Sequence, residues 1–320
     1  MTISGFTMAK NATKLYFPIK ESILSILPIV DEFIVALGDC DEDDKTRDEI
    51  SSILSPKIKI IDTVWDTRKF PRSTELARQT DIARKACKGD WLFYLQSDEV
   101  VHEKDLEIIK NRCAEFQHDD EVEGLLFDYK HFWGDYDHYH NAHGWYPSEI
   151  RVIKNRPDIR PWRDAQSFRK IQDFKEGDWH EYYRKEGTEK LKVVRAGADI
   201  YHYGWVRPPE VMTSKKVNHD SLHHGSDKGQ VMNQATPLEF DYGPLNKLPV
   251  FHGSHPVAMK DKINELYWKS SLQYKGNVRQ GRNLHKHEKL KNRLTTFIEQ
   301  KVLGGKQIGT FKNYCLLKKK

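Results

Sequence analysis

The sequence is poor in cysteine, and its cysteines show no pairing pattern. Only Cys40, Cys87, Cys113 and Cys315 occur among 320 residues, and they are scattered along the chain. The absence of paired spacings argues against a disulfide frame and against a cysteine-rich zinc site. The pattern is typical of reduced thiols in the cytosol.

Long apolar runs are missing as well. Hydrophobic residues make up 38% of the chain and charged residues 31%, and no apolar stretch approaches the length that crosses a bilayer. The N-terminus shows no basic segment followed by an apolar one, which a secretory signal would have. We therefore expect a globular, cytoplasmic protein. Since internal repeats and Gly/Ser linkers are also absent, we expect one continuous domain with C-terminal additions.

Acidic residues become scarce towards the end of the chain. From Lys260 onward, 16 Lys or Arg stand against 4 Asp or Glu, whereas the preceding part carries 36 basic and 43 acidic residues. A basic tail suits an anionic membrane surface, an acidic acceptor or nucleic acid. A solvated basic helix explains the same composition.

The first half of the chain alternates short buried strands with amphipathic helices. Strands are predicted over residues 3–8, 33–37, 58–64 and 91–95, and helices are predicted to follow each of them. This alternation predicts an α/β, Rossmann-like fold with a mostly parallel central sheet and helices on both faces. Further helices near 259–272 and 287–303 would complete the chain.

Two of the predicted strands end in acidic residues. Asp98 and Glu99 follow the apolar run 91–95, and Asp39 follows the run 33–37. Ligands of open α/β sheets bind at the carboxyl ends of strands, and carboxylates there can hold a divalent cation that grips a diphosphate. The same acids would also suit helix N-termini, so the motif alone leaves both interpretations open.

The second half contains a segment dense in histidine and aromatic residues. His131, His138, His140 and His143 are interleaved with Tyr129, Phe132, Trp133, Tyr136, Tyr139 and Trp145. Three interpretations fit this composition: a buried aromatic patch, a loop that binds a sugar acceptor, and a histidine metal site of a metallohydrolase. For the acceptor loop, the binding residues would be Trp133, His143 and Trp145.

Taken together, these motifs resemble the inverting family-two glycosyltransferases of the GT-A fold. The resemblance covers roughly the first two-thirds of the chain. It lies in the helix 17–27, the Asp-rich loop 38–46, the helix–Gly–strand–acid core 78–99, the Arg-bearing strand 148–153 and the Tyr-His-Tyr-Gly-Trp block 201–205. Such enzymes transfer a sugar from a nucleotide-sugar donor.

The resemblance implies roles for several residues. Asp39 would contact the base or ribose, Arg78 would hold the base, and Asp98 would ligate the metal on the diphosphate. His202 would be a metal or phosphate ligand, although a structural histidine gives the same pattern. Gln96 stands where the family often has the first Asp of Asp-x-Asp, and it can hydrogen-bond ribose without a charge. We therefore expect weak, substrate-assisted binding of Mg²⁺ or Mn²⁺, with Glu99 as a further possible ligand.

Inverting transfer also needs a general base beside the acceptor hydroxyl. Asp164 is the candidate, because it lies where the family's base-bearing segment falls; a helix N-cap explains it equally well. Glu149 and Asp178 are reserves.

We therefore expect a GT-A glycosyltransferase of the hexosyltransferase type, acting on a hydroxyl of a glycan or lipid-linked glycan. Residues 1–205 would form the catalytic domain, with a nucleotide-sugar half (1–123) and an acceptor half (124–205). Residues 206–320 would be a mostly helical, basic extension packed on the same domain, with a peripheral contact at an anionic membrane. One alternative is a binder of anionic surfaces or nucleic acid through this extension. It leaves the strand-end acids unexplained, because phosphate binders line their sites with basic groups, and we expect no nucleic-acid partner.

Overall fold

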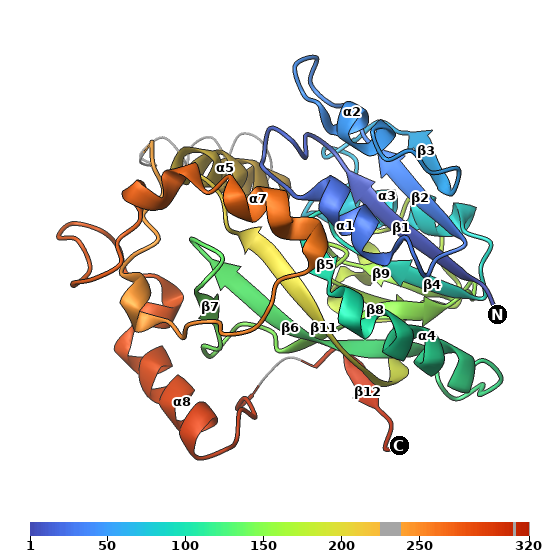
Figure 1. The fold of residues 1–320 in the computed structure, drawn as a ribbon. Coiled ribbons are helices and arrows are strands. Elements are labelled where there is room, and N and C mark those ends of the chain that lie inside the picture. The colour runs from blue at the N-terminus through green and yellow to red at the C-terminus, as the bar shows by residue number, and fades with distance from the viewer. Residues whose placement is uncertain (225–237, 310–311, 320) are drawn as a thin grey trace.

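The protein is built around one mixed β-sheet, seen here in a computed structural model that describes residues 1–224, 238–309 and 312–319 (Figure 1). The main strand order is β3-β2-β1-β4-β8-β6-β11-β10-β9. The strands are β1 (Ile3–Ala9), β2 (Glu32–Leu37), β3 (Ile58–Asp62), β4 (Trp91–Tyr94), β5 (Glu99–Val101), β6 (Gly124–Trp133), β7 (Tyr139–His140), β8 (Ser148–Lys154), β9 (Ile159–Trp162), β10 (Ser167–Lys170), β11 (Glu189–Trp205) and β12 (Tyr314–Leu316).

The pairing pattern divides the sheet into two parts. In the first part, β1 pairs in parallel with β2 and β4, and β2 pairs in parallel with β3. Strand β8 is antiparallel to both β4 and β6 and joins this part to the second one, in which β6 and β11 run parallel. The α/β fold predicted from the sequence is confirmed.

Helices cover both faces of the first part. They are α1 (Ile19–Ile26), α2 (Thr46–Ser51), α3 (Thr74–Ala86) and α4 (Leu106–Glu115), followed later by α5 (Pro209–His224), α7 (Lys260–Asn264) and α8 (Leu290–Lys301). The helix predicted over 259–272 is instead the short α7 and a 3-10 turn, Tyr267–Ser271. None of the described helices has the length and apolarity needed to span a bilayer.

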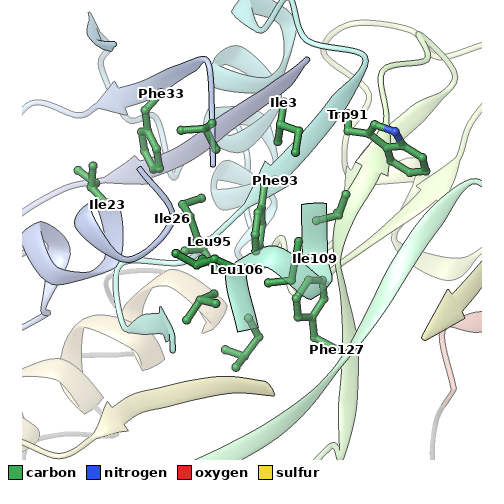
Figure 2. Packing of buried hydrophobic residues seen from close by; sticks show 14 of the residues in the cluster. Ile3, Ile23, Ile26, Phe33, Trp91, Phe93, Leu95, Leu106, Ile109 and Phe127 are labelled. Atoms are coloured by element: carbon green, nitrogen blue, oxygen red, sulfur yellow. The ribbon is translucent and has the colours of Figure 1, made fainter. Parts of the chain in front are cut away.

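Strand β4 shows why the sheet needs both layers of helices. Alternate side chains of a strand point to opposite faces. Trp91 and Phe93 therefore join one buried cluster with α1 and α4 (Figure 2), whereas Leu92 and Tyr94 join another that includes Ala83 of α3. All four side chains of the strand are fully buried, as expected for a strand with helices on both sides.

A third buried cluster ties the C-terminal region to the second part of the sheet. It is rich in aromatic residues and includes Trp133 of β6, Tyr203 of β11, Tyr242 and Trp268. Trp268 Nε1 donates to the Gly134 carbonyl oxygen at 2.9 Å. The chain then returns to the sheet as β12, which pairs in parallel with β11. The region after residue 205 is therefore partly core and partly sheet, as well as helix.

Candidate functional site

A cavity of about 520 Å³ opens where β1 and β4 end. Its lining includes the segment 8–11 after β1, the segment 96–98 after β4, residues Tyr146, Asp164 and Gln166, and His202 and Trp205 of β11. Lys215 and Lys216 of α5 complete one wall. The structure thus brings together four predicted site residues from distant parts of the chain: Gln96, Asp98, Asp164 and His202. The predicted acceptor residue Trp145 also lines this cavity.

Asp98 and His202 form the centre of the site. Asp98 Oδ2 lies 3.6 Å from His202 Nε2, and both side chains are about nine-tenths buried. Burial opposes ionisation of Asp98, but the charges of His202 and Lys215 outweigh it and hold the pKa of Asp98 below its ordinary value. The carboxylate therefore stays ionised in the folded protein.

A chain of hydrogen bonds fixes the orientation of His202. His131 Nε2 lies 2.8 Å from the Tyr146 carbonyl oxygen, which can only accept, so this nitrogen carries the proton. Burial, and then the charge of His202, lower the pKa of His131 well below its usual value, so the ring is neutral and its Nδ1 accepts. His202 Nδ1 lies 2.9 Å from that acceptor and donates to it. His202 Nε2 is thereby directed at Asp98.

The backbone at Gly204 passes directly beside this pair. A Cβ atom there would lie 2.5 Å from His202 Nε2 and 2.6 Å from Asp98 Oδ2, closer than real Cβ contacts. The preceding residue, Tyr203, donates its N–H to the Asp98 carbonyl oxygen at 2.8 Å. Glycine at position 204 therefore leaves room for the two side chains to meet.

The positive charges of Lys215 and Arg207 both act on Asp98. Lys215 Nζ donates to the Gly204 carbonyl oxygen at 2.6 Å and lies 3.5 Å from Asp98 Oδ2. Burial, and then the Arg207 guanidinium, lower the pKa of Lys215 to about 7 against the attraction of Asp98. Arg207 is fully buried, and its Nη1 donates to the Leu15 carbonyl oxygen at 2.6 Å. These charges favour an anion in the cavity.

Once Nε2 of His202 has lost its proton, the Asp98–His202 pair also offers two ligands to a divalent cation. A carboxylate oxygen and an imidazole nitrogen held by a second hydrogen bond are ordinary metal donors. Within the described residues, no group of three or more His, Cys, Asp or Glu side chains could hold a metal ion. A cation held by this pair alone would need its remaining ligands from a bound anion or water.

Glu99 does not belong to this ligand set. Arg151 holds it in a fully buried, two-bonded ion pair, with Nε and Nη2 each 2.7 Å from a carboxylate oxygen. The Tyr129 hydroxyl donates to the same carboxylate at 2.7 Å. Glu99 therefore ties β5 to β8 and β6, and the sequence-based suggestion that it could ligate a metal is wrong.

Asp39 lies beside the cavity without lining it. Its Oδ1 accepts from the Trp65 N–H and from Lys10 Nζ, each at 2.9 Å, and both of these partners line the cavity. Burial would raise the pKa of Asp39, but these two donors lower it. Arg78 is further back: it binds Glu75 in two bonds and donates to the Val64 carbonyl oxygen at 2.7 Å. Arg78 thus supports the segment that carries Trp65.

Asp164 reaches the cavity from a turn between β9 and β10. The neighbouring residues Arg163 and Ala165 have positive φ angles of 59° and 60°, which the tight turn requires. Because no helix begins there, the N-cap interpretation is wrong. Glu149 is buried nearby, and Gln166 Nε2 donates to its Oε1 at 3.0 Å. Burial, together with the charge of Asp164, raises the pKa of Glu149 to about 7.

The histidines of the histidine-rich segment contact different residues. His131 contacts His202, His138 Nδ1 lies 2.9 Å from Asp135, and His143 Nδ1 lies 2.8 Å from Glu299. A common metal centre, as the metallohydrolase alternative requires, is therefore not formed.

Trp133 and His143 do not reach the cavity, although both were predicted to bind the acceptor. Trp133 is buried, stacks on Trp205 with ring centroids 4.8 Å apart, and donates its Nε1–H to the Tyr242 carbonyl oxygen. The ring of Trp145, which does line the cavity, lies 5.8 Å from both Trp133 and Trp205. Trp133 thus backs the wall that Trp145 and Trp205 present.

Several lining residues escaped the sequence-based prediction. Lys10 and Asn11 were visible only as polar residues after the first strand, where a strand-end rule could have selected them. Lys215 lies within a helix with no local motif around it. Only the docking of α5 beside β11 brings it to Asp98, so no sequence signal could have found it.

Comparisons with known proteins give structural similarity only. No family model matches the chain, and no curated protein matches it in sequence. Among solved structures it is similar to S. aureus TarS, with 13% identity over 73% of this chain and 42% of that chain and a TM-score of 0.37. It is also similar to glucosyl-3-phosphoglycerate synthase from Mycobacterium tuberculosis in complex with Mn²⁺, uridine diphosphate and phosphoglyceric acid, with 19% identity over 41% of this chain and 43% of that chain and a TM-score of 0.28. The chain thus spans less than half the length of either protein, and similarity at this level establishes neither family nor activity.

Proposed function

We propose that the protein is a glycosyltransferase that takes a nucleotide-sugar donor in the cavity beside Asp98. The observation that carries this proposal is the ionised Asp98, paired with His202 and facing Lys215 where parallel strands end. A purely structural acid would not need a neighbouring cavity of about 520 Å³ lined by cations and aromatic rings.

The diphosphate of the donor would lie against Asp98, His202 and Lys215. Asp98 and His202 would hold a divalent cation, Mg²⁺ or Mn²⁺, which would supply Lewis-acid stabilisation of the leaving diphosphate. Lys215 supplies a second positive charge at the same place. Lys10 also lines the cavity, lies 2.9 Å from Asp39, and would add positive charge near the ribose.

The nucleoside would extend towards Trp65. The Trp65 ring packs against Gly38, where a Cβ atom would lie 2.4 Å from Trp65 Nε1. The backbone N–H of Trp65 donates to Asp39 Oδ1. An aromatic ring at the cavity wall gives a base a surface on which to stack. Asp39, Arg78 and Gln96 would then all be donor-site residues. Asp39 and Arg78 would position Trp65, whereas Gln96 would contact the donor directly.

The acceptor would enter from the side of Asp164 and Trp145. Asp164 is the carboxylate that lines this side, and as a general base it would take the proton of the attacking hydroxyl. The hydroxyl oxygen would displace the nucleoside diphosphate from the anomeric carbon in one step, which inverts that carbon. Trp145 and Trp205 offer rings to the apolar faces of sugars. We place the donor half at residues 1–123, the acceptor half at 124–205 and the extension at 206–320, and we propose a glycan or lipid-linked glycan as acceptor.

The substitution Asp164→Asn tests this assignment. It keeps the shape of the side chain but removes the base, so we expect donor binding within about twofold of wild type and turnover lowered by roughly 10²–10⁴-fold. Binding would be followed by titration with uridine diphosphate and Mn²⁺, because structures of both similar proteins include complexes with uridine diphosphate. Turnover would be followed by release of nucleoside diphosphate from nucleotide sugars.

The substitution Asp178→Asn is the matched control for Asp164→Asn, since it makes the same change at a carboxylate that does not line the cavity. Unchanged turnover in Asp164→Asn, with turnover lost in a Glu149→Gln variant, would move the base to Glu149. Unchanged turnover in both variants would refute a carboxylate base in this cavity.

A further inference from the structure

Helix α8 (Leu290–Lys301) has its apolar side facing outward. Leu290, Leu294 and Phe297 share one face of the helix, and their exposed fractions are 68%, 57% and 61%. Ile298 beside them and Val302 just after the helix are also exposed. A helix of a globular protein normally turns its apolar stripe to the core, so this face lacks a partner within the described residues.

The opposite face of α8 attaches the helix by polar contacts. Glu299 is fully buried and accepts from His143 Nδ1 at 2.8 Å, and Thr296 Oγ1 accepts from the His143 N–H at 2.9 Å. Gln300 Nε2 donates to the Asn141 carbonyl oxygen at 3.0 Å. The orientation of α8 is therefore fixed by hydrogen bonds, and the outward apolar face follows from it.

Positive charge surrounds this face. The exposed basic residues of the segment 286–306 are Lys286, Lys289, Lys291, Arg293, Lys301 and Lys306. Its only two acids are used internally, since Glu288 is paired with Arg282 at 2.7 Å and Glu299 with His143. Apolar side chains flanked by lysine and arginine match the interface of an anionic bilayer, where acyl chains lie below negatively charged headgroups.

We propose that α8 and the residues that follow it dock on an anionic lipid surface. The apolar face of α8 enters the headgroup region, and the surrounding lysines and Arg293 bind the lipid charges. A second copy of the chain is a poorer occupant, because two such faces would bring twelve positive charges together. In Figure 1, α8 lies at the edge of the molecule, on the side of β7 and far from β3, where a flat surface can reach it.

A hydrogen bond links the segment after α8 to a residue that lines the cavity. Gln307 Nε2, six residues beyond α8, donates to the carbonyl oxygen of Trp145, and Trp145 lines the cavity. The surface thus lies next to the side proposed for the acceptor, which suits an acceptor carried by lipid. The docking proposal itself stands on α8 alone and does not require the protein to transfer sugars.

Vesicle flotation of the full chain tests the proposal. We expect binding to vesicles of one part phosphatidylglycerol and two parts phosphatidylcholine, and little binding to phosphatidylcholine alone. The double substitution Leu294→Glu/Phe297→Glu should weaken binding to the anionic vesicles by roughly tenfold or more, because it removes two apolar groups and adds two negative charges. The substitution Leu54→Glu, at a side chain 96% exposed and distant from α8 in sequence, is the matched control and should bind like wild type.

Melting temperatures of all three proteins, and their size in solution, complete the test. Equal melting temperatures show that the double variant is folded. The proposal is refuted if wild type does not bind the anionic vesicles at low salt, or if the double variant binds as wild type does. It is also refuted if wild type is a dimer that the double variant converts to a monomer, since α8 would then cover a second copy.

Discussion

The site depends on a few residues whose properties come from their surroundings. Asp98 is an ordinary strand-end carboxylate in the sequence, and it becomes a potential cation ligand because His131 directs His202 at it and Gly204 leaves space. Asp98 and its strand-end position could be predicted from an apolar run followed by acids. His131 and Lys215 could not, because their roles depend on contacts across the fold.

Glu149 makes a residue-scale prediction about pH. Its pKa is raised to about 7 by burial and by Asp164, so the folded state binds this proton more tightly than the unfolded state does. The resulting stability is complete below the unfolded pKa, near 4.5, and is lost as the pH rises through 7. The substitution Glu149→Gln should therefore stabilise the protein by up to about 3 kcal/mol above pH 7 and by little at pH 4.5.

Urea unfolding of wild type and Glu149→Gln between pH 4.5 and 8 measures this difference. Comparison of the two proteins cancels the titration of all other groups. A stability difference that stays constant with pH would show that Glu149 does not hold a proton in the folded state.

At the scale of elements, the ion pair between Glu99 and Arg151 joins β5 to β8. Both side chains are fully buried, so removing one leaves the other charged and unpaired. We expect Arg151→Leu to cost about 3–5 kcal/mol of stability, and the double variant Arg151→Leu/Glu99→Gln to recover more than half of it. Chemical unfolding of the single and double variants measures both values. Additive losses in the double variant would contradict this account.

The long strands and the first helices could be predicted from periodicity, whereas the short strands could not. β9 and β10 were not predicted as strands, because each is four residues long and their hairpin joins the sheet only where β10 pairs with the distant β11. Their hairpin turn is what carries Asp164 to the cavity. Elements that owe their existence to distant partners leave little signal in the local sequence.

At the scale of the molecule, the basic C-terminal region is not a single solvated helix. Trp268 is buried in the aromatic cluster, β12 extends the sheet, and α8 presents an apolar face to the outside. Composition could predict the charge of this region. It could not predict which part is buried, which part adds a strand and which part stays exposed, because this depends on contacts with the sheet.

The most direct test of the central claim is the melting temperature with nucleoside diphosphates, each with and without Mn²⁺. At about 100 times the dissociation constant, a bound ligand adds about 2.7 kcal/mol, so we expect a rise of several degrees with one nucleotide, larger with Mn²⁺. The substitution Asp98→Asn should abolish the Mn²⁺-dependent part. The matched control Asp62→Asn, at an exposed carboxylate where β3 ends, should retain it. No shift with any nucleotide, or an equal shift in Asp98→Asn and wild type, would contradict a donor site at Asp98.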